Sequence, residues 1–296
     1  MSGPLLVVDA PFVLYRSFFG LPETIRASDG QPRNALLGAC NLLLRVVAET
    51  SPRAVVACFG AEQAPYRVAL HAGYHAQRPP MPAGLALQWP LAPGLFADFG
   101  WQPRDAGELE ADDLLGALAR AEAAAGGETL ILTGDRDLYQ CVDDHARVLY
   151  LRQGSAGFET VDEAEVKRRY GVSPALVPDF IALRGDPSDG LPGAPGIGAK
   201  TAAALLARHG SLETLLRDVA SDDCGERPRI AAILREHSPA LRRYREIATL
   251  VPLAVERPRD AQTDLRAAAA AAAALGMGNL AGRLESAVSV ADLRMR

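Results

Sequence analysis

Eight acidic side chains fall into four clusters that could together hold divalent metal ions. Asp9 comes directly after the apolar run Leu5–Val8, and Asp135 and Asp137 follow the apolar run Thr129–Thr133. Both runs are short, apolar or β-branched and bounded by turn residues, which predicts buried strands. Ligands of open α/β sheets bind beyond the carboxyl ends of the strands. Two strands are therefore expected to bring carboxylates to one edge, although each aspartate taken alone could simply cap the next helix.

A third cluster precedes the helix that the pattern predicts over Leu114–Ala125. It consists of Glu110, Asp112 and Asp113, and acidic residues in a first turn suit the helix dipole. That role accounts for one or two of them, whereas three within four residues also repel one another. Mg²⁺ and Mn²⁺ take oxygen ligands, often carboxylates together with water. We therefore expect a divalent cation beside this turn.

The fourth cluster, Asp186 and Asp189, lies in a loop of turn residues that could be a plain surface turn. The loop leads into Leu191–Thr201, where Gly196 and Gly198 stand directly before a predicted helix. Such a helix start presents unpaired backbone N–H groups to a phosphate, and glycine keeps side chains out of the way. This pattern, followed by another helix, is typical of a helix–hairpin–helix motif that holds a nucleic-acid backbone.

Strands and helices alternate in the first half of the chain, which predicts an α/β domain with a mostly parallel central sheet flanked by helices. The predicted strands are Leu5–Val8, Ala54–Phe59, Thr129–Thr133, Val148–Leu151 and Phe158–Val161, with helices at Ala35–Ala48 and Leu114–Ala125 between them. From Pro65 to Pro103, seven prolines interrupt the alternation. Such an excursion indicates a lid or binding loop, or alternatively a poorly packed surface insertion.

After Gly171 the pattern is helical. The predicted helices are Pro174–Leu183, Lys200–Arg208, Ser211–Leu216, Pro228–Glu236, Pro239–Ala248 and a segment around the alanine run Ala267–Ala274. We therefore divide the chain into an α/β domain over residues 1–171 with an insertion at about 65–108, a helical region over 172–260 and a C-terminal helical tail over 261–296.

The composition excludes several classes of protein. The chain has 296 residues, of which 49% are hydrophobic and 23% charged, the balance of a soluble globular protein. Charged residues interrupt the apolar start, which excludes a signal peptide or a membrane span there. The cysteines form no CxxC pair, which favours a reducing interior over a disulfide framework; they are Cys40, Cys58, Cys141 and Cys224.

The net charge of −5 argues at first against a nucleic-acid partner. Without the eight clustered acids, however, 31 basic residues stand against 28 acidic ones, which leaves +3. Whole-chain charge says little about a local site. An acidic pocket filled with metal ions, on a mildly basic surface, is therefore compatible with a phosphodiester partner.

Taken in order, these motifs resemble those of the 5′-nuclease family, which comprises flap endonucleases and the 5′–3′ exonuclease domain of bacterial DNA polymerase I. The matching segments are Leu5–Asp9 with Tyr15 and Arg16, Leu109–Asp113, Thr133–Gln140, Gly185–Gly193 and Gly196–Thr201. The resemblance implies a PIN-like sheet and a helix–hairpin–helix of the H3TH type. No polymerase domain follows, so we expect a free-standing member.

The resemblance also carries over functional residues. The implied metal ligands are Asp9, Glu110, Asp112, Asp113, Asp135, Asp137, Asp186 and Asp189. Of these, Asp9, Glu110 and Asp112 would chiefly bind a first ion. Asp135, Asp137 and Asp189 would bind a second, with Asp113 and Asp186 bridging or acting through water. The ions would be Mg²⁺ or Mn²⁺, two or more in number, with K⁺ as a further candidate at the hairpin.

Other residues carry over to the DNA. The implied phosphate-facing catalytic residues are Arg16, Arg67, Arg78 and, where relatives place a lysine, His75. The implied DNA-backbone contacts are Gly193, Gly196, Ile197, Gly198, Lys200 and Thr201. One ligand is missing, because the family has Phe-Asp after the second strand and this chain has Phe59-Gly60.

The implied activity is that of a structure-specific 5′ nuclease, a metal-dependent 5′–3′ exonuclease or flap endonuclease that hydrolyses DNA phosphodiesters with two metal ions. Its partner would be branched, flapped or nicked DNA with a 5′ end, and we expect a cytoplasmic, nucleoid-associated monomer with no membrane partner, acting in DNA repair or replication. Two alternatives stay open. Gly60 and His75 also fit a catalytically weakened DNA-structure-binding protein of the same fold. The acidic edge alone also fits a single-strand ribonuclease.

Overall fold

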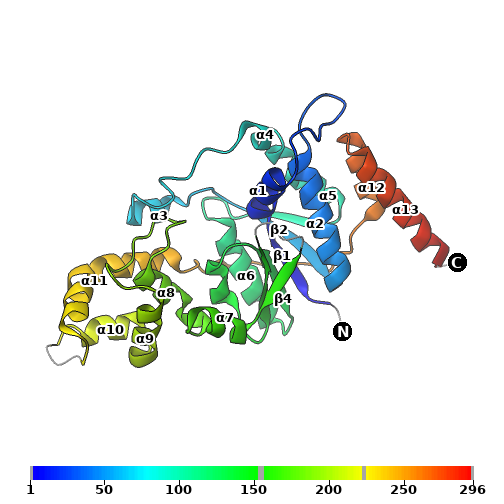
Figure 1. Cartoon of the computed structure of the whole chain (residues 1–296). Helices are drawn as coiled ribbons and strands as arrows, with labels where there is room; N and C mark the ends of the chain where they lie inside the picture. The colour runs from blue at the N-terminus through cyan, green and yellow to red at the C-terminus, as the bar shows by residue number, and fades with distance from the viewer. Residues whose placement is uncertain (1–2, 153–156, 222–224, 295–296) are drawn as a thin grey trace.

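A six-stranded sheet forms the centre of the molecule (Figure 1). The computed structural model describes residues 3–152, 157–221 and 225–294, so Cys224 lies outside the described residues. The strands are β1 (Leu5–Asp9), β2 (Ala54–Phe59), β3 (Gln102–Asp105), β4 (Thr129–Thr133), β5 (Ala146–Leu151) and β6 (Phe158–Val161), in the order β3-β2-β1-β4-β5-β6. All neighbouring strands are parallel except β5 and β6. The prediction of a mostly parallel sheet is confirmed.

Helices cover both faces of the sheet, because alternate side chains of a strand point to opposite sides. On β1, Leu5 and Val7 belong to one hydrophobic cluster and Leu6 and Val8 to the other. The first cluster is covered by α6 (Ala111–Ala124), the short 3₁₀ helix η2 (Asp137–Cys141) and α7 (Glu163–Tyr170). The second is covered by α1 (Ala10–Gly20), α2 (Asn34–Thr50), α5 (Ala92–Asp98), α12 (Leu265–Ala274) and α13 (Gly278–Arg294).

The proline-rich insertion divides into two parts with different roles. Its second half is core structure, because Leu85, Phe96 and Trp101 are buried. It contributes α4 (Ala83–Ala86), the 3₁₀ turn η1 (Trp89–Leu91), α5 and the edge strand β3. The sequence pattern did not predict β3, in which Pro103 is tolerated because the strand lies at the sheet edge. The first half, from α3 (Pro65–Leu70) to the start of α4, adds no strand to the sheet and forms the excursion, although Tyr74 within it packs into the core.

The helical region contains η3 (Pro174–Leu176), α8 (Val177–Arg184), α9 (Ala199–His209), α10 (Leu212–Asp218) and α11 (Pro228–Ala248). The prediction of two helices, split before Pro239, is wrong, since α11 runs through this proline. A proline inside a helix removes one backbone hydrogen bond. The buried face of α11, which includes Leu234, Leu241 and Tyr244, outweighs that loss by packing continuously against the region around α8.

The segment 249–264 links α11 to α12 along the sheet edge, so that the helical region and the α12–α13 hairpin lie at opposite ends of the molecule (Figure 1). The buried guanidinium of Arg53 pairs with Glu122 and, at 2.6 Å, with Asp260 of this segment. Trp101 donates its indole N–H to the hydroxyl of Thr263 at 3.0 Å. An ion pair from the buried Arg53 and a hydrogen bond from the buried Trp101 therefore hold the link in place.

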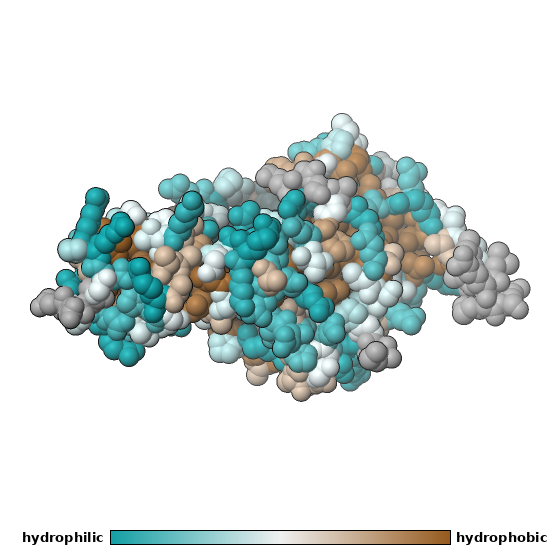
Figure 2. All heavy atoms as spheres, turned by 60° about the horizontal axis from the view of Figure 1, so that its bottom comes forward, coloured by the Kyte–Doolittle hydropathy of each residue, from teal (hydrophilic) through white to brown (hydrophobic). Residues whose placement is uncertain are grey.

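The outer face shown in Figure 2 is covered mainly by hydrophilic residues, with hydrophobic atoms visible between them. Among the residues that the structure describes, no helix combines the length and the apolar character needed to cross a membrane. The thiols of Cys40, Cys58 and Cys141 are free, in keeping with the absence of paired cysteine motifs.

Candidate metal centre and nucleic-acid interface

Asp9 joins the carboxyl ends of two neighbouring strands. It closes β1, and its Oδ1 accepts a hydrogen bond from the backbone N–H of Phe12 at 3.0 Å, so it caps α1. Its Oδ2 accepts a bond from the hydroxyl of Thr133, the last residue of β4, at 2.7 Å. Burial raises the pKa of Asp9, although both of these bonds favour its ionised form. Asp9 therefore caps α1, as one interpretation of the sequence predicted, and it also lies at the carboxyl ends of the parallel strands, as the other predicted.

The carboxylates of the separate acidic clusters lie close enough to disturb one another's charge. Burial raises the pKa of Asp112 well above its ordinary value, and Asp135 and Asp9 raise it further. Burial raises the pKa of Asp135 to about 7, with Asp189 as the strongest neighbouring charge. Burial is also the main cause of the raised pKa of Asp137, followed by Asp135 and Asp189. We call Asp9, Asp112, Asp135, Asp137, Asp186 and Asp189 the acidic pool.

The donor set of the acidic pool fits a divalent cation of the Mg²⁺ or Mn²⁺ type, which prefers oxygen ligands. Such an ion offsets the mutual repulsion between these buried and half-buried carboxylates. Within residues 3–152, 157–221 and 225–294, no three carboxylate, imidazole or thiol groups stand in an arrangement that would hold an ion as they are. Charge and donor chemistry are what the acidic pool offers to a metal ion.

Glu110 and Asp113 are both held by a buried arginine and by further hydrogen-bond donors. Glu110 Oε1 accepts a hydrogen bond from the backbone N–H of Ala64 at 2.8 Å, and Oε2 accepts one from the hydroxyl of Tyr74 at 2.8 Å. Arg67 pairs with Glu110 at 2.9 Å and with Asp113 at 2.8 Å. The predicted position of Arg67 is corrected, because this side chain is only 2% exposed and faces these carboxylates.

His75 and Arg78 hold the loop that carries Asp189. The Nε2 atom of His75 lies 3.1 Å from Asp189 Oδ1, and the backbone N–H of His75 donates to the carbonyl oxygen of Asp189 at 3.1 Å. The imidazole stacks on Tyr74 at a ring separation of 3.8 Å. His75 is therefore buried, contrary to the prediction that it faces a phosphate. Arg78 lies 3.3 Å from Asp189 Oδ1 with a side chain that is 41% exposed, so it can face a ligand.

Arg16 points along the surface of α1 toward the end of β5. It donates from Nη1 to the carbonyl oxygen of Arg152 at 2.6 Å. Partial burial, and after it the charge of Arg45, lowers the pKa of its guanidinium. Arg16 lies in the second turn of α1, the helix that Asp9 caps.

The loop with Asp186 and Asp189 is joined directly to the glycine hairpin. Asp186 exchanges two backbone hydrogen bonds with Leu191, each 2.8 Å long. Gly193 has φ +68°, and a Cβ there would lie 2.4 Å from the backbone nitrogen of Gly185, so only glycine fits. The hairpin is therefore anchored against the end of α8, beside the loop that carries the pool's last two aspartates.

The tip of the hairpin is open to solvent. Gly196 and Gly198 have nothing within 4 Å of where a Cβ would stand, and Gly198 caps the start of α9. Lys200 is exposed and Thr201 half-buried in the first turn of α9. Ile197, by contrast, is 4% exposed and packs into the core, so its side chain anchors the hairpin from below. The other residues of the tip present a surface that a backbone phosphate can approach.

The family of the chain is decided by two matches that together span most of its length. A family model described as "5'-3' exonuclease, N-terminal resolvase-like domain" matches residues 4–171. A second, described as "5'-3' exonuclease, C-terminal SAM fold", matches residues 172–268. The chain belongs to the 5′–3′ exonuclease family. The resemblance to 5′ nucleases stated from the motifs is thereby confirmed.

Related proteins of the 5′–3′ exonuclease family include free-standing enzymes and polymerase domains. A 5′–3′ exonuclease of Mycobacterium tuberculosis is 37% identical over 286 residues, which cover 88% of each chain. One from Streptomyces coelicolor is 41% identical over 221 residues, covering 70% of this chain and 72% of the relative. DNA polymerase I of Mycobacterium leprae is 36% identical over 248 residues, but the chain spans only 27% of that polymerase.

Solved structures share the fold of this exonuclease-family chain at low sequence identity. The T5 5′-exonuclease with bound zinc has a TM-score of 0.67 and 15% identity, with 97% of this chain and 99% of that chain covered. The catalytic core of Rad2 in complex with a DNA substrate has a TM-score of 0.59 and 14% identity, with 96% and 92% covered. These similarities confirm the predicted PIN-like architecture.

Gly60 is the position where this exonuclease-family chain departs from the expected Phe-Asp pair, and the surrounding backbone has closed over it. A Cβ at Gly60 would lie 2.5 Å from the carbonyl oxygen of Leu109 and 2.7 Å from the nitrogen of Ala111. The backbone N–H of Ala61 donates to the same Leu109 oxygen at 2.8 Å. The start of α6 therefore occupies the space that a side chain at position 60 would need.

Two residues of the site were not found from the sequence. Thr133 binds Asp9, and Tyr74 binds Glu110. The available signal for Thr133 is its place at the end of a strand, directly before the acidic motif of Asp135. Nothing in the sequence pattern near Tyr74 indicates its partner, which is 36 residues away.

Gly60→Ala is expected to lower the free energy of unfolding by about 1–3 kcal/mol, because the added methyl group meets backbone atoms that must shift. Thermal unfolding of the purified protein measures this loss. Gly94→Ala is the control, since Gly94 lies exposed in α5 with nothing within 4 Å, and alanine there should raise stability by about 0.5–1 kcal/mol. Equal, small effects at the two positions would show that the backbone is not closed over Gly60.

Proposed function

We propose that the protein cuts DNA phosphodiesters next to a 5′ end or 5′ flap, with Mg²⁺ or Mn²⁺ bound in the acidic pool. The observation that carries this proposal is the convergence of four acidic segments beyond the carboxyl ends of β1 and β4. Aspartates far apart in sequence raise one another's pKa there. Membership in the 5′–3′ exonuclease family supports the same reaction class.

The ions would be held by the six aspartates of the pool. When bound, a pair of divalent cations lowers the pKa of a bound water and stabilises charge on the scissile phosphate. The pool residues fix the place of this chemistry, since Thr133 orients Asp9 and the bond from the backbone N–H of Asp137 to Asp135 Oδ1, 2.8 Å long, orients Asp135. Arg78 would contact the phosphate from the solvent side, being paired with Asp189 while remaining 41% exposed.

The hairpin would hold the duplex next to the pool. Gly196, Gly198 and Lys200 expose backbone N–H groups and one ammonium at the start of α9, where the helix dipole favours a phosphate. Phosphate contacts of this kind position a protein on DNA without reading its sequence. Selection would then depend on DNA shape, with K⁺ as the candidate ion at the hairpin.

The first half of the insertion would meet the 5′ strand. Its residues from α3 to Arg78 lie against the acidic pool, because His75 contacts Asp189. A 5′ end or flap that leaves the duplex at the hairpin would pass this segment. We propose that the protein acts as a cytoplasmic, nucleoid-associated monomer, with residues 1–171 forming the nuclease domain, residues 172–260 the DNA-holding region and residues 261–296 a helical tail.

Asp135→Asn is expected to reduce cleavage of a 5′-flap duplex by about 100-fold or more, since even residues that only support metal ligands change activity by about 10–100-fold. The assay follows cleavage of a 5′-labelled flap in the presence of Mg²⁺ or Mn²⁺. A parallel reaction contains a chelator in place of the metal ion, and no cleavage is expected in it. Asp144→Asn is the matched control, because Asp144 is exposed and outside the pool, and it should cut like the wild type.

Other outcomes of the same assay separate the alternatives. Tight binding of the flap without cutting by the wild type would favour a DNA-structure-binding protein. Equal cutting of unstructured RNA would favour a ribonuclease. Full activity of Asp135→Asn would remove the acidic pool from the reaction.

Lys200→Ala is expected to weaken duplex binding several-fold and to reduce the slope of log affinity against log salt concentration by about 1, as loss of one phosphate contact does. Fluorescence anisotropy at several salt concentrations, in the Asp135→Asn background to prevent cutting, gives both values. The chain has only one other lysine, Lys167, which is exposed and paired with Glu163 at 2.6 Å. Lys167→Ala should leave the slope unchanged, and an equal effect of the two variants would argue against the hairpin as the binding surface.

A further inference from the structure

Arg67 joins three separate parts of the chain. It lies in α3, at the base of the excursion, with its side chain almost fully buried. Its guanidinium makes two bonds to Asp113 in α6, at 2.8 and 3.1 Å, and one ion pair with Glu110 at 2.9 Å. Its Nε donates to the carbonyl oxygen of Ile247 in α11 at 3.0 Å. One side chain therefore links the excursion, the acidic end of α6 and the helical region.

Asp113 is saturated by these and two further donors. Its Oδ1 also accepts the backbone N–H of Val251, just after α11, at 2.8 Å, and its Oδ2 accepts the backbone N–H of Glu110 at 3.2 Å. The residue is 0% exposed. Four N–H donors therefore surround its two oxygens, which leaves neither oxygen turned toward the acidic pool.

Asp112, the next residue along the chain, has the opposite surroundings. Adjacent residues of a helix point about 100° apart, and Asp112 faces the carboxylates of Asp135 and Asp9. It is half-buried, and the strongest charges around it are negative. The first turn of α6 thus places Asp112 beside the other carboxylates of the acidic pool and Asp113 against the guanidinium of Arg67.

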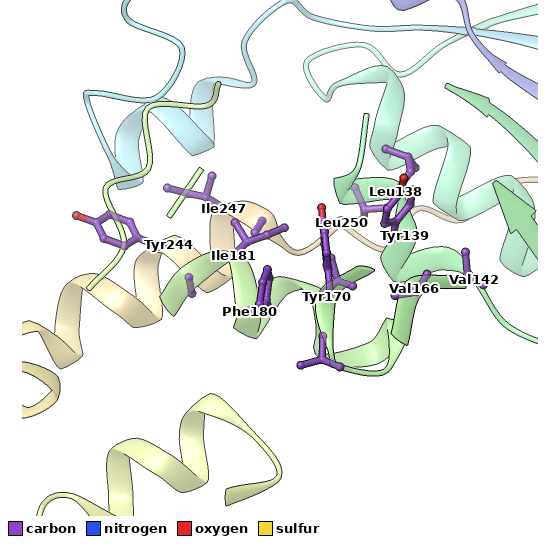
Figure 3. Close-up of a cluster of buried hydrophobic side chains, with 14 of the residues drawn as sticks. Leu138, Tyr139, Val142, Val166, Tyr170, Phe180, Ile181, Tyr244, Ile247 and Leu250 are labelled. Carbon is purple, nitrogen blue, oxygen red and sulfur yellow. The ribbon is translucent and has the colours of Figure 1, made fainter. Parts of the chain in front are cut away.

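Hydrophobic packing continues the link between α11 and the pool (Figure 3). Leu138 and Tyr139 follow Asp137 in η2, and they lie in the same cluster as Ile247 and Leu250. In Figure 3, Tyr170 and Phe180 lie in the same group of side chains, and their rings stack with centroids 4.8 Å apart. The helical region therefore packs against η2, the short helix that begins with Asp137 of the acidic pool.

We propose that Arg67 is a positioning residue: by pairing with Glu110 and Asp113 it withdraws both carboxylates from ion binding and ties the acidic end of α6 to α11. The inference rests on the proposed function, because it concerns which acids hold the ions. It narrows the eight ligands implied by the family to the six aspartates of the acidic pool. It also gives a physical route by which the DNA-holding region and the acidic pool keep one relative position.

The first test compares the two neighbouring aspartates in the DNA-free protein. Mn²⁺ is titrated into wild type, Asp112→Asn and Asp113→Asn by calorimetry, and thermal unfolding is recorded without metal. Asp112→Asn should weaken Mn²⁺ binding by about tenfold or more and leave the unfolding temperature unchanged or raised, since it removes a repelling charge. Asp113→Asn should keep the Mn²⁺ affinity within about twofold and lower the unfolding temperature, because it breaks a buried pair.

Loss of Mn²⁺ binding in a folded Asp113→Asn protein would overturn the proposal. Should that variant fail to fold, Glu110→Gln takes its place with the same expectation, since glutamine keeps the shape and one acceptor. If the wild type bound no Mn²⁺ at all, the proposed function would fail. The contrast in unfolding temperature between the two aspartate variants would still decide the role of Arg67.

The second test separates positioning from direct phosphate contact. Arg67→Lys keeps one positive charge but loses the bidentate pairing with Asp113. Flap cleavage by this variant should therefore have a lower kcat than that of the wild type, while its KM for DNA stays within about twofold of the wild-type value. Arg67→Met should be slower still, so that the lysine gives partial rescue. The salt dependence of DNA binding should be the same in all three proteins, because a buried guanidinium releases no counterion. A decrease of about 1 in that slope for Arg67→Met would make Arg67 a phosphate contact and contradict the proposal.

Discussion

Repulsion between carboxylates gathered at one edge of the sheet is the constraint on which the rest of the structure depends. Parallel strands end on the same side, so β1 and β4 necessarily bring Asp9 and Asp135 together. Each further aspartate that joins them raises the free energy of the ionised state, and burial adds to this cost. Burial, and after it the charge of neighbouring aspartates, raises the pKa values of Asp112, Asp135 and Asp137. A fold that keeps such a cluster needs compensating positive charge.

Arginines around the margin of the pool supply part of that charge. Arg184 pairs with Asp186 at 3.1 Å, and Arg78 lies 3.3 Å from Asp189. Arg67 neutralises Glu110 and Asp113 on the far side of α6. None of these arginines is the main neighbour of Asp112 or Asp135, whose strongest charged neighbours are other aspartates. The centre of the pool is therefore left for a ligand of high positive charge.

Much of the fold followed from local patterns in the sequence. The strands β2, β4 and β6 begin and end at the predicted residues, because each is a short run of mainly apolar or β-branched residues beside turn formers. The edge strand β3 was missed, since its residues Gln102–Asp105 are polar and include a proline. The continuous helix α11 was missed because the packing that keeps it intact across Pro239 comes from a distant part of the chain.

The site was predictable as a set of residues but only partly as a set of contacts. Spacing indicated that the acidic motifs would meet, since strand ends are a local property. It could not indicate that Arg67 is buried, because its partners Asp113 and Ile247 are 46 and 180 residues away. His75 likewise depends on Asp189, which is 114 residues away. The missing side chain at Gly60 was visible in the sequence, whereas the backbone that has closed over it was not.

The most direct test of the central claim is a crystal soaked in Mn²⁺, with the ions located from their anomalous scattering. The account predicts Mn²⁺ bound by carboxylate oxygens of the acidic pool, among them Asp112, Asp135 and Asp137, with Asp113 still held by Arg67. Peaks only on other faces of the molecule, or a pool that stays without Mn²⁺ at saturating concentration, would contradict it.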